Sequence, residues 1–462
     1  RPGTIFAALP GTRTDGAVFT DQAIEKGAVA IVGCGLDLLS RRVPYVEVED
    51  PRCALADIAC ALYGFPTRQM KTVGVTGTNG KTTVTFLVRD ILRAAGFRPG
   101  LVGTLRYEVG DRMIPASHTT PESPLLQQMF DEMLRAGCDS AVMEVSSHAL
   151  DQERVRGIDF DVTVFTNLTQ DHLDYHHSID RYFQAKARLF ARGGLAGKDT
   201  RMVVNIDDAW GRKLALRGGS GGLLITYGTQ PEARVQAEDV SVTVDGIRFR
   251  VVTPWGDAKL KIGLLGRFSL SNALAALATG GALGVDFDVM THALQQAEPV
   301  PGRLERIPNA QGINIFVDYA HTPDALENVL KSLREVTGER LISVFGCGGD
   351  RDRLKRPAMG AVSVRHADYT ILTSDNPRSE DPGIIIAEIA KGCENLGCVS
   401  QIPDRRAAIL EALSLAEPGD SVLIAGKGHE SVQVIGEESL KFDDREVTRE
   451  VLDEMDRGRR GF

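Results

Sequence analysis

Residues 72–83 read Thr72-Val73-Gly74-Val75-Thr76-Gly77-Thr78-Asn79-Gly80-Lys81-Thr82-Thr83. The pattern predicts a buried strand that runs into a glycine-rich turn and then opens a helix. Gly77 and Gly80 lack Cβ atoms, so backbone N–H groups can approach an anion closely, and the helix N-terminus adds partial positive charge. We expect this loop to bind a nucleotide, with Lys81 at the terminal phosphates and the Thr82 hydroxyl on a magnesium ion.

The spacing departs from the strict pattern of a glycine, four residues and Gly-Lys-Ser/Thr. Val75 stands at the position of the first glycine, and the nearest upstream glycine is Gly74. A generic nucleotide-binding loop is therefore the minimum interpretation. The alternative is a plain glycine turn between a strand and a helix.

Composition limits the class of protein. A chain of 462 residues suggests about three domains. Its net charge of −9 argues against a nucleic-acid or membrane-surface protein, which needs a basic face. The seven cysteines form no CxxC pair, so neither a disulfide framework nor a zinc site is expected. With no apolar segment long enough to span a membrane and no visible signal peptide, we expect a cytoplasmic protein, and we expect a monomer.

Three α/β domains are expected. Residues 1–48 form a small N-terminal unit, and the chain starts at Arg1, so we expect this unit to be truncated. Residues 49–299 alternate strand and helix, which favours a mostly parallel sheet, with antiparallel strands appended at the Asp245-Gly246 turn. Residues 300–462 repeat the alternation and predict a second, doubly wound Rossmann-like sheet. In the central domain Thr120 is expected to cap a helix that ends at Gly137.

Polar segments follow several predicted strands. Strands at 141–145 and 162–166 are followed by polar loops, and ligands bind beyond the carboxyl ends of strands in open α/β sheets. Glu144, Asp171 and His172 near a phosphate loop suggest a magnesium site, since hard cations prefer oxygen ligands. Glu144 could instead be a satisfied buried carboxylate. His176 and His177 are expected at the surface.

Lys186 lies in an amphipathic helical pattern at residues 182–190. Its residue type and position alone favour a solvated lysine, because lysines on helices usually face water.

Six motifs together resemble the Mur ligase family, in family order and over nearly the whole chain. They are Gly77-Thr78-Asn79-Gly80-Lys81-Thr82-Thr83, Met143-Glu144-Val145-Ser146-Ser147-His148-Ala149-Leu150, Asn167-Leu168-Thr169-Gln170-Asp171-His172-Leu173-Asp174-Tyr175-His176, Pro301-Gly302-Arg303-Leu304-Glu305, Asp318-Tyr319-Ala320-His321-Thr322-Pro323-Asp324 and Gly426-Lys427-Gly428-His429-Glu430. Within the family they are most similar to the branch that makes the UDP-MurNAc-tripeptide.

The resemblance implies an ATP-dependent amide-bond-forming ligase of peptidoglycan precursor synthesis, and with it a role in cell wall biogenesis, cell shape and division. Its substrates would be ATP, UDP-MurNAc-L-Ala-D-Glu and an amino acid. The acceptor carboxylate would attack the γ-phosphate of ATP, and an amine would then displace phosphate from the acyl phosphate. The family's Asp-Ser-Arg segment, which helps to bind uridine diphosphate, would precede Arg1.

The resemblance also assigns residues. The catalytic set would be Lys81, Glu144, His172 and Lys186. The metal site would comprise Thr82, Glu144, His172 and Lys186, the last as a CO2-derived carbamate that supplies oxygen ligands to Mg²⁺. The ATP site would comprise Gly77, Thr78, Asn79, Gly80, Lys81, Thr82, Thr83, Asn272, Arg303 and Asp318. The muramoyl-dipeptide site would comprise His118, Thr119, Thr120, Ser146, Gln152 and Arg154. Two positions depart from the family, which often has Asn where this chain has His118 and Ser269.

The amino acid would be set by Asp375-Asn376-Pro377-Arg378, whose arginine resembles the meso-diaminopimelate-adding branch. Diaminopimelate carries a distal carboxylate that a guanidinium can bind with two hydrogen bonds and that lysine lacks. The pocket would comprise Arg351, Asp375, Asn376, Pro377, Arg378, Gly426 and Glu430. The simpler interpretation is an Asn-Pro turn with Arg378 as a surface charge.

Three alternatives remain open from the sequence. The ligase could add L-lysine. It could be another amide ligase of the superfamily, such as one like folylpolyglutamate synthetase. It could also be a nucleotide-binding module without catalysis, although such a module needs no metal site on the acceptor side.

Overall fold

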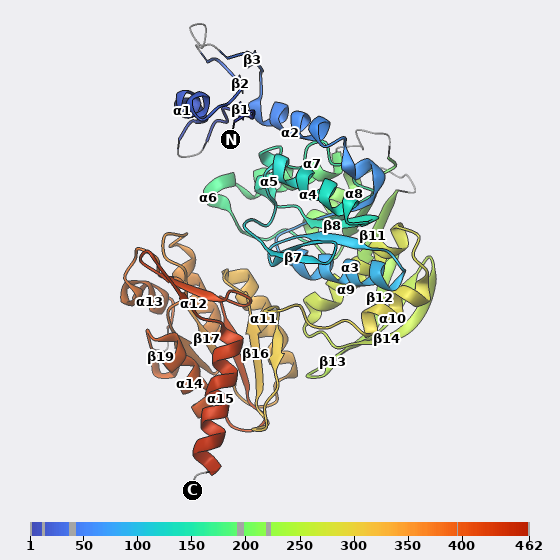
Figure 1. The fold of residues 1–462 in the computed structure, drawn as a ribbon. Helices are drawn as coiled ribbons and strands as arrows, with labels where there is room; N and C mark the ends of the chain where they lie inside the picture. Colours follow the sequence, from blue (N-terminus) through green and yellow to red (C-terminus); the bar gives the residue numbers. More distant parts are fainter. Residues whose placement is uncertain are drawn as a thin grey trace.

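The computed structural model describes residues 2–11, 14–36, 43–191, 198–218, 223–394 and 396–460. Within these residues the chain forms an N-terminal sheet of three strands, a central sheet of eleven, a C-terminal sheet of six and a separate two-stranded hairpin. Figure 1 shows the N-terminal unit in blue at one end, the central body beside it and the C-terminal body in orange and red. The predicted α/β class is confirmed, while the three domain boundaries stay predictions.

The N-terminal unit is a short parallel sheet. Its strands are β1 (Ile5–Ala7), β2 (Ala30–Gly33) and β3 (Tyr45–Glu47), with η1 (Gly16–Phe19) and α1 (Thr20–Glu25) between the first two. Its core is small and centres on Ala28 and Ile31. α2 (Pro51–Leu62) then leads into the central domain. The helix begins here because Asp50 caps it and Pro51 suits a first helical position.

The central sheet is parallel in its middle and antiparallel at both ends. Its order is β14-β13-β12-β11-β10-β9-β4-β8-β5-β6-β7. The strands are β4 (Lys71–Thr76), β5 (Pro99–Val102), β6 (Arg106–Val109), β7 (Arg112–Pro115), β8 (Ser140–Glu144), β9 (Val162–Phe165), β10 (Arg201–Asn205), β11 (Leu224–Gly228), β12 (Val235–Thr243), β13 (Gly246–Thr253) and β14 (Gly256–Ile262). The predicted hairpin of β12 and β13 is present, but its two-residue loop is Val244-Asp245, one residue earlier than expected, because Gly246 already pairs with Thr243.

Helices cover both faces of this sheet. On one face α3 (Lys81–Ala94), α9 (Arg267–Ala282) and α10 (Phe287–Gln295) share a core with Val142 of β8. On the other face α4 (Ser123–Arg135) packs against Met143, the next residue of the same strand. Neighbouring strand residues point to opposite faces, so β8 is buried on both sides. The remaining elements here are η2 (Pro66–Gln69), α5 (Ser147–Asp151), α6 (Leu173–His176), α7 (Ile179–Ala191) and α8 (Ala209–Arg217).

The expected start of α4 was wrong. The helix begins at Ser123 with Glu122 at the N-cap and no side-chain cap bond. The Thr120 hydroxyl instead donates to the Glu144 carbonyl at 2.9 Å and accepts from the Ser146 N–H at 3.0 Å. Tertiary bonds to a neighbouring strand end thus replace the local cap. Gly137 does follow the helix, with φ +79°.

The C-terminal sheet is parallel except at β15, as the doubly wound prediction requires. Its order is β15-β16-β20-β17-β18-β19. The strands are β15 (Glu305–Ile307), β16 (Asn314–Asp318), β17 (Leu341–Phe345), β18 (Tyr369–Leu372), β19 (Val399–Gln401) and β20 (Ser421–Ala425), with the hairpin β21 (Val432–Ile435) and β22 (Glu438–Lys441). The helices α11 (Pro323–Val336), α12 (Lys355–His366) and α13 (Pro382–Ala390) cover one face, and α14 (Arg405–Leu415) and α15 (Asp444–Arg460) cover the other, with η3 (Leu396–Cys398) at the edge. Among the described residues, no helix is long and apolar enough to span a membrane.

Candidate functional site

The glycine-rich loop between β4 and α3 is packed tightly against two other segments. Gly77 has φ +149° and Gly80 has φ +86°, values that side-chain-bearing residues rarely adopt. A Cβ at Gly77 would lie 1.8 Å from the Thr166 hydroxyl, and one at Gly80 would lie 2.3 Å from Asn272 Oδ1. The Thr78 and Asn79 N–H groups are both held by Asn167, through its backbone and side-chain oxygens. The loop is therefore fixed by the segment after β9 and by α9.

Two lysines meet at this loop, Lys81 partly buried and Lys186 fully buried. Lys81 Nζ donates to the carbonyls of Gly77 at 2.9 Å and Thr78 at 2.8 Å. Lys186 Nζ, from α7, donates to the same Gly77 carbonyl at 2.7 Å and lies 4.5 Å from the Tyr182 ring centroid. Burial lowers the pKa of both ammonium groups, and the charge of Lys81 lowers that of Lys186 further.

The interpretation of Lys186 as a solvated lysine was wrong. Its side chain is buried, because the 182–190 pattern turns this position toward the loop and not toward water. The spacing itself indicates this placement, since Lys186 follows Tyr182 by four residues and precedes Leu189 by three, and both are buried on the same side of α7.

Glu144, at the end of β8, joins the loop to the strand edge. Its Oε1 accepts from the Thr82 hydroxyl at 3.0 Å and from the Thr104 N–H at 2.8 Å, and its Oε2 accepts from the Thr104 hydroxyl at 3.1 Å. Arg303 Nη2 donates to the Thr82 oxygen at 3.3 Å. Among the described residues, Arg303 Nε is buried without a hydrogen-bond partner, so one edge of this guanidinium can still bind an anion. Thr104 is a neighbour of the candidate site that the sequence motifs did not indicate.

His172 borders the same region from the start of α6. Its backbone has φ +53°, its Nε2 lies 3.4 Å from Asp171 Oδ2, and its ring stacks edge-on against His148. Burial, His148 and the two lysines lower the pKa of His172 to about 4, against the opposing effect of Asp171. The ring is therefore neutral at pH 7 and has a lone pair available for a metal ion.

Of the two later histidines expected at the surface, His176 and His177, only one is exposed. His176 is buried, with Nε2 2.9 Å from the Ser147 hydroxyl, while His177 is exposed as predicted. Within the described residues, no group of three or more His, Cys, Asp or Glu side chains could hold a metal ion. A divalent cation at Glu144 and His172 would therefore need further oxygen ligands from a substrate or a modified side chain.

Four of the residues predicted to bind the dipeptide lie together. Arg154 donates to the Thr120 carbonyl at 3.0 Å and to Gln152 Oε1 at 2.6 Å, and Thr120 bonds to Ser146. Thr119 lies next to the group around Glu144, because its hydroxyl is 3.0 Å from that of Thr104, which bonds to Glu144. His118 is exposed, with Nδ1 3.3 Å from the Ser117 hydroxyl.

Asp318 has internal partners. Its carboxylate accepts from the Leu304 N–H at 2.6 Å and the Ala320 N–H at 2.7 Å, and burial raises its pKa. These bonds hold the strand end of β16 against residues 302–305, which carry Arg303. The structure thus places Asn272 against the loop glycine and Arg303 against Thr82, while Asp318 orients the segment that carries Arg303.

The predicted amino-acid pocket forms around one amide. Asn376 Nδ2 donates to Glu430 Oε2 at 2.7 Å, and Asn376 Oδ1 accepts from the Val434 N–H at 2.9 Å. Lys427 Nζ lies 3.2 Å from Asn376 Oδ1 and 3.3 Å from Glu430 Oε2. Lys427 is fully buried and was not predicted as a site residue, although the Gly426-Lys427-Gly428 motif contains it.

The remaining pocket residues surround this group. Arg378 has φ +53°, and its Nη1 donates to the Gly349 carbonyl at 2.7 Å. Asp375 is buried and accepts from the Asn376 N–H, and a Cβ at Gly426 would lie 2.6 Å from Asp375 Oδ2. Pro377 is buried beside them, and Arg351 is exposed on the loop after β17. The turn of 375–378 is present, but Arg378 is partly buried in it and is not a free surface charge.

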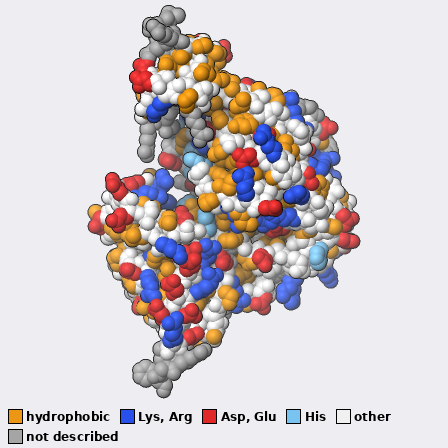
Figure 2. Space-filling model, in the orientation of Figure 1, with side chains coloured by type: hydrophobic (Ala, Val, Ile, Leu, Met, Phe, Trp, Pro, Cys, Tyr) orange, Lys and Arg blue, Asp and Glu red, His pale blue; other side chains and the backbone are white. Residues whose placement is uncertain are grey.

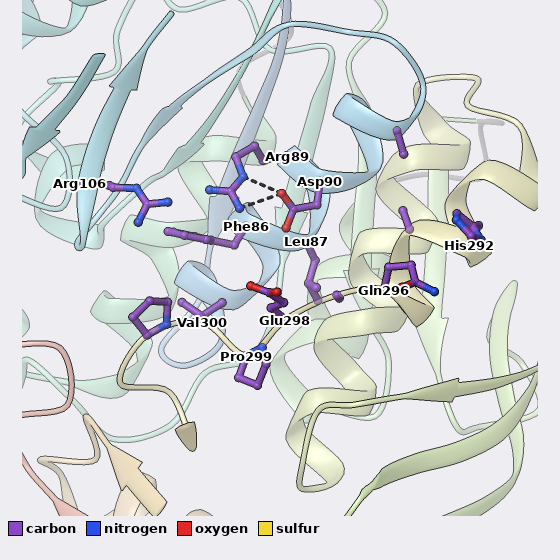
Figure 3. A pocket seen from close by; sticks show the side chains of 14 residues that line it. Phe86, Leu87, Arg89, Asp90, Arg106, His292, Gln296, Glu298, Pro299 and Val300 are labelled. Atoms are coloured by element: carbon purple, nitrogen blue, oxygen red, sulfur yellow. Dashed lines mark hydrogen bonds and ion pairs between the residues drawn. The ribbon is translucent and has the colours of Figure 1, made fainter. Parts of the chain in front are cut away.

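A cavity of about 590 Å³ lies away from these groups. Figure 3 shows it between α3, α10 and the linker at 296–301, with Phe86, Arg89, Asp90 and Glu298 on its walls. None of the predicted site residues lines it. Figure 2 instead shows histidine side chains in the hollow where the central and C-terminal bodies meet, in keeping with the positions of the loops described above.

Comparison with known proteins gives three family matches in chain order. Residues 1–63 match the Mur ligase family, catalytic domain; residues 75–280 match the Mur ligase middle domain; and residues 302–428 match the Mur ligase, glutamate ligase domain.

Two relatives bear on function, and a third on the fold. A UDP-N-acetylmuramoyl-L-alanyl-D-glutamate–2,6-diaminopimelate ligase of Geobacter metallireducens is 46% identical, covering 98% of this chain and 92% of that protein. A solved structure of a ligase of the same name is 33% identical with a TM-score of 0.70, covering 99% of this chain and 93% of the other. Folylpolyglutamate synthase of Mycobacterium tuberculosis, at 20% identity, 81% coverage of this chain, 92% of the other and a TM-score of 0.64, shows the fold alone.

Proposed function

Because this chain belongs to the Mur ligase family, we propose that it joins meso-diaminopimelate to the D-Glu of UDP-MurNAc-L-Ala-D-Glu at the expense of ATP. It is an amide-bond-forming ligase of peptidoglycan precursor synthesis. The observation that carries the proposal is the meeting of Lys81, Glu144 and Lys186 at one phosphate loop, next to Arg303 from the following domain.

Phosphoryl transfer comes first. A carboxylate is a poor electrophile, so its oxygen attacks the γ-phosphorus of ATP, the bond to ADP breaks and an acyl phosphate forms. Lys81 and Arg303 would neutralise charge that develops on the transferred group. Lys81 would exchange its loop carbonyls for phosphate oxygens, and the unpartnered edge of Arg303 fits the same anion.

The amine attacks next. Its nitrogen bonds to the acyl carbon, a tetrahedral intermediate forms, phosphate leaves and the amine loses a proton. Arg154 would hold a carboxylate of the dipeptide, since its guanidinium lies beside Thr120 and Gln152, which we propose to bind the same ligand.

The cation site would comprise Thr82, Glu144, His172 and carbamylated Lys186. A bound Mg²⁺ would stabilise negative charge on phosphate and carboxylate oxygens. The residues fit this use, because His172 is neutral and Glu144 supplies a carboxylate. Lys186 fits carbamylation, because only a neutral amine attacks CO2 and burial lowers its pKa. The new N–C bond releases a proton and leaves an anion in place of an ammonium that would repel the metal.

Diaminopimelate would lie at Asn376, Arg378 and Glu430. Arg378 would bind the distal carboxylate, and Glu430 or Asp375 would face the distal ammonium. Gly426, Pro377 and Arg351 complete the pocket in this proposal. We further propose that the protein acts as a monomer in the cytoplasm and supports cell shape and division.

The test combines purified protein, ATP, Mg²⁺ and UDP-MurNAc-L-Ala-D-Glu and measures phosphate release with meso-diaminopimelate or with L-lysine. We expect release with diaminopimelate and little with lysine. Equal rates, or faster release with lysine, would overturn the amino-acid assignment. Release with neither amine would overturn the ligase proposal. If the protein used only the substrates of folylpolyglutamate synthetase, that activity would replace the proposed one.

A further inference from the structure

Asp324 connects the C-terminal domain to the phosphate loop. It is the second residue of α11, and its Oδ2 accepts a hydrogen bond from Asn79 Nδ2 at 2.9 Å and another from the Thr169 hydroxyl at 2.9 Å. Asn79 lies in the phosphate loop, and Thr169 lies in the segment after β9. One carboxylate oxygen of the C-terminal domain is thus bonded to both segments that form the nucleotide end of the central domain.

Helix capping does not account for this arrangement. The Thr322 hydroxyl already caps α11 by accepting from the Ala325 N–H at 3.3 Å. An acidic residue in the first turn does favour a helix through the dipole, but that effect needs no partner in another domain. Asn328, one turn later in α11, donates to the same oxygen at 3.2 Å and is the only donor of the three that belongs to the C-terminal domain.

Two ion pairs also join the two domains, at a distance from the phosphate loop. Arg267 of α9 pairs with Glu335 of α11 at 2.7 Å, and Arg306 pairs with Asp245 at 3.4 Å. Both pairs are largely exposed, and neither touches the phosphate loop. Figure 1 shows α11 on the side of the C-terminal body that faces α9. Asp324, like Arg303 at Thr82, therefore lies at the end of this interface that reaches the phosphate loop.

We infer that Asp324 is a positioning residue that holds the C-terminal domain in a fixed position relative to the phosphate loop. The inference rests on the proposed function, in which the acyl phosphate forms on the central domain and the amine is bound by the C-terminal domain. Misplacement of reacting atoms by about 1 Å can cost about 100-fold in rate. Asp324 is not among the residues proposed to bind a substrate, and it acts through Asn79 and Thr169.

The test is the Asp324→Ala variant in the phosphate-release assay, with ADP affinity measured by calorimetry. We expect kcat to fall at least about tenfold, while ADP affinity and the KM for diaminopimelate stay within about threefold, because the groups proposed to bind those ligands are intact. Thr169→Val should lower kcat in the same direction. The double variant should lose less than the product of the two single losses, since both remove one interaction.

Two variants are matched controls. Asn328→Ala removes the donor within α11 and leaves both interdomain bonds, and Glu335→Gln weakens an exposed interdomain pair far from the loop. Both should keep kcat within about twofold. Wild-type kcat in Asp324→Ala would overturn the inference, as would an equal loss in Glu335→Gln, which would indicate general loosening of the interface.

A second readout does not depend on ligation. Small-angle X-ray scattering of the ADP-bound protein should show a larger radius of gyration for Asp324→Ala than for wild type, and no change for Asn328→Ala. If the wild type releases no phosphate, the proposed function fails while scattering still decides the role of Asp324. Identical scattering from all variants would then overturn the positioning role.

Discussion

At the scale of single residues, the nucleotide loop shows how burial changes chemistry. Lys81 and Lys186 are of the same residue type and both donate to the Gly77 carbonyl, yet we propose that one neutralises phosphate and the other becomes an anion. The difference comes from their surroundings, since the charge of Lys81 adds to burial in lowering the pKa of Lys186.

Lys186→Ala should lose at least about 100-fold in kcat, because no carbamate oxygen can then reach the metal. The phosphate-release assay measures this loss, and added bicarbonate should not restore activity. Lys213→Ala, on the exposed side of α8, is the control and should be active. Normal turnover of Lys186→Ala would rule out the carbamate role.

Arg378→Ala should raise the KM for meso-diaminopimelate about ten- to 100-fold, because it removes charge-assisted hydrogen bonds to the distal carboxylate. In steady-state kinetics, the ratio of kcat/KM for diaminopimelate to kcat/KM for L-lysine should shrink by the same factor. Arg353→Ala removes another arginine of this domain, one that pairs with Glu388, and should leave the KM values for both amino acids unchanged. An unchanged preference in Arg378→Ala would contradict the assignment.

At the scale of elements, helices α14 and α15 support the proposed amino-acid pocket through one buried ion pair. Arg405 Nε donates to Asp444 Oδ1 at 2.7 Å, with both side chains fully buried. The same guanidinium donates to the carbonyls of Ser374 at 3.2 Å and Ala425 at 2.9 Å. These carbonyls precede the two loops that carry Asp375 and Gly426, so the helix pair and the pocket share a support.

Asp444→Asn should destabilise the protein by about 3 kcal/mol, because it leaves Arg405 buried without a countercharge. Urea denaturation followed by circular dichroism measures the change. Glu454→Gln is a matched control, since Arg406 and Glu454 join the same two helices in an exposed pair and should contribute less than about 1 kcal/mol. Equal losses in the two variants would show that burial of the pair is unimportant.

At the scale of the whole molecule, acid should destabilise the fold through histidines that are held neutral. Burial lowers the pKa of His176 to about 4 and that of His429 to about 3, against about 6.5 in an unfolded chain. Between these values the unfolded chain binds more protons than the folded one, so stability falls as the pH drops from about 6.5 toward 4.

The pH prediction is tested by thermal denaturation at pH 7 and pH 5. The midpoint should be lower at pH 5, and His176→Gln should show a smaller drop than the wild type, because each such histidine contributes up to about 1.4 kcal/mol per pH unit. His177→Gln, at the exposed neighbour, should behave like the wild type. A drop in His176→Gln as large as that of the wild type would exclude His176 as a source.

Much of the fold could be predicted from the sequence because its signals are local. The strand, glycine turn and helix at 72–94, the Asp245-Gly246 hairpin and the alternation of the C-terminal sheet depend on residues close in the chain. Thr120 shows where local rules fail, because its hydroxyl is used by β8 and not by the next helix. His176 shows the same for burial, since its buried ring is hydrogen-bonded to Ser147 of another helix.

The sequence by itself determined the α/β class, the phosphate loop and the set of motifs that identifies the family, because each depends on residue types at short and regular spacing. Only the tertiary structure decided that Lys186 is buried against Gly77, that Lys427 contacts Asn376 and Glu430, and that Asp324 is bonded to Asn79. Asn79 and Asp324 are 245 positions apart, and Lys186 and Gly77 are 109 apart. Such contacts depend on how segments far apart in the chain pack within a domain, or between two domains in the case of Asp324, and no local pattern of residues specifies that packing.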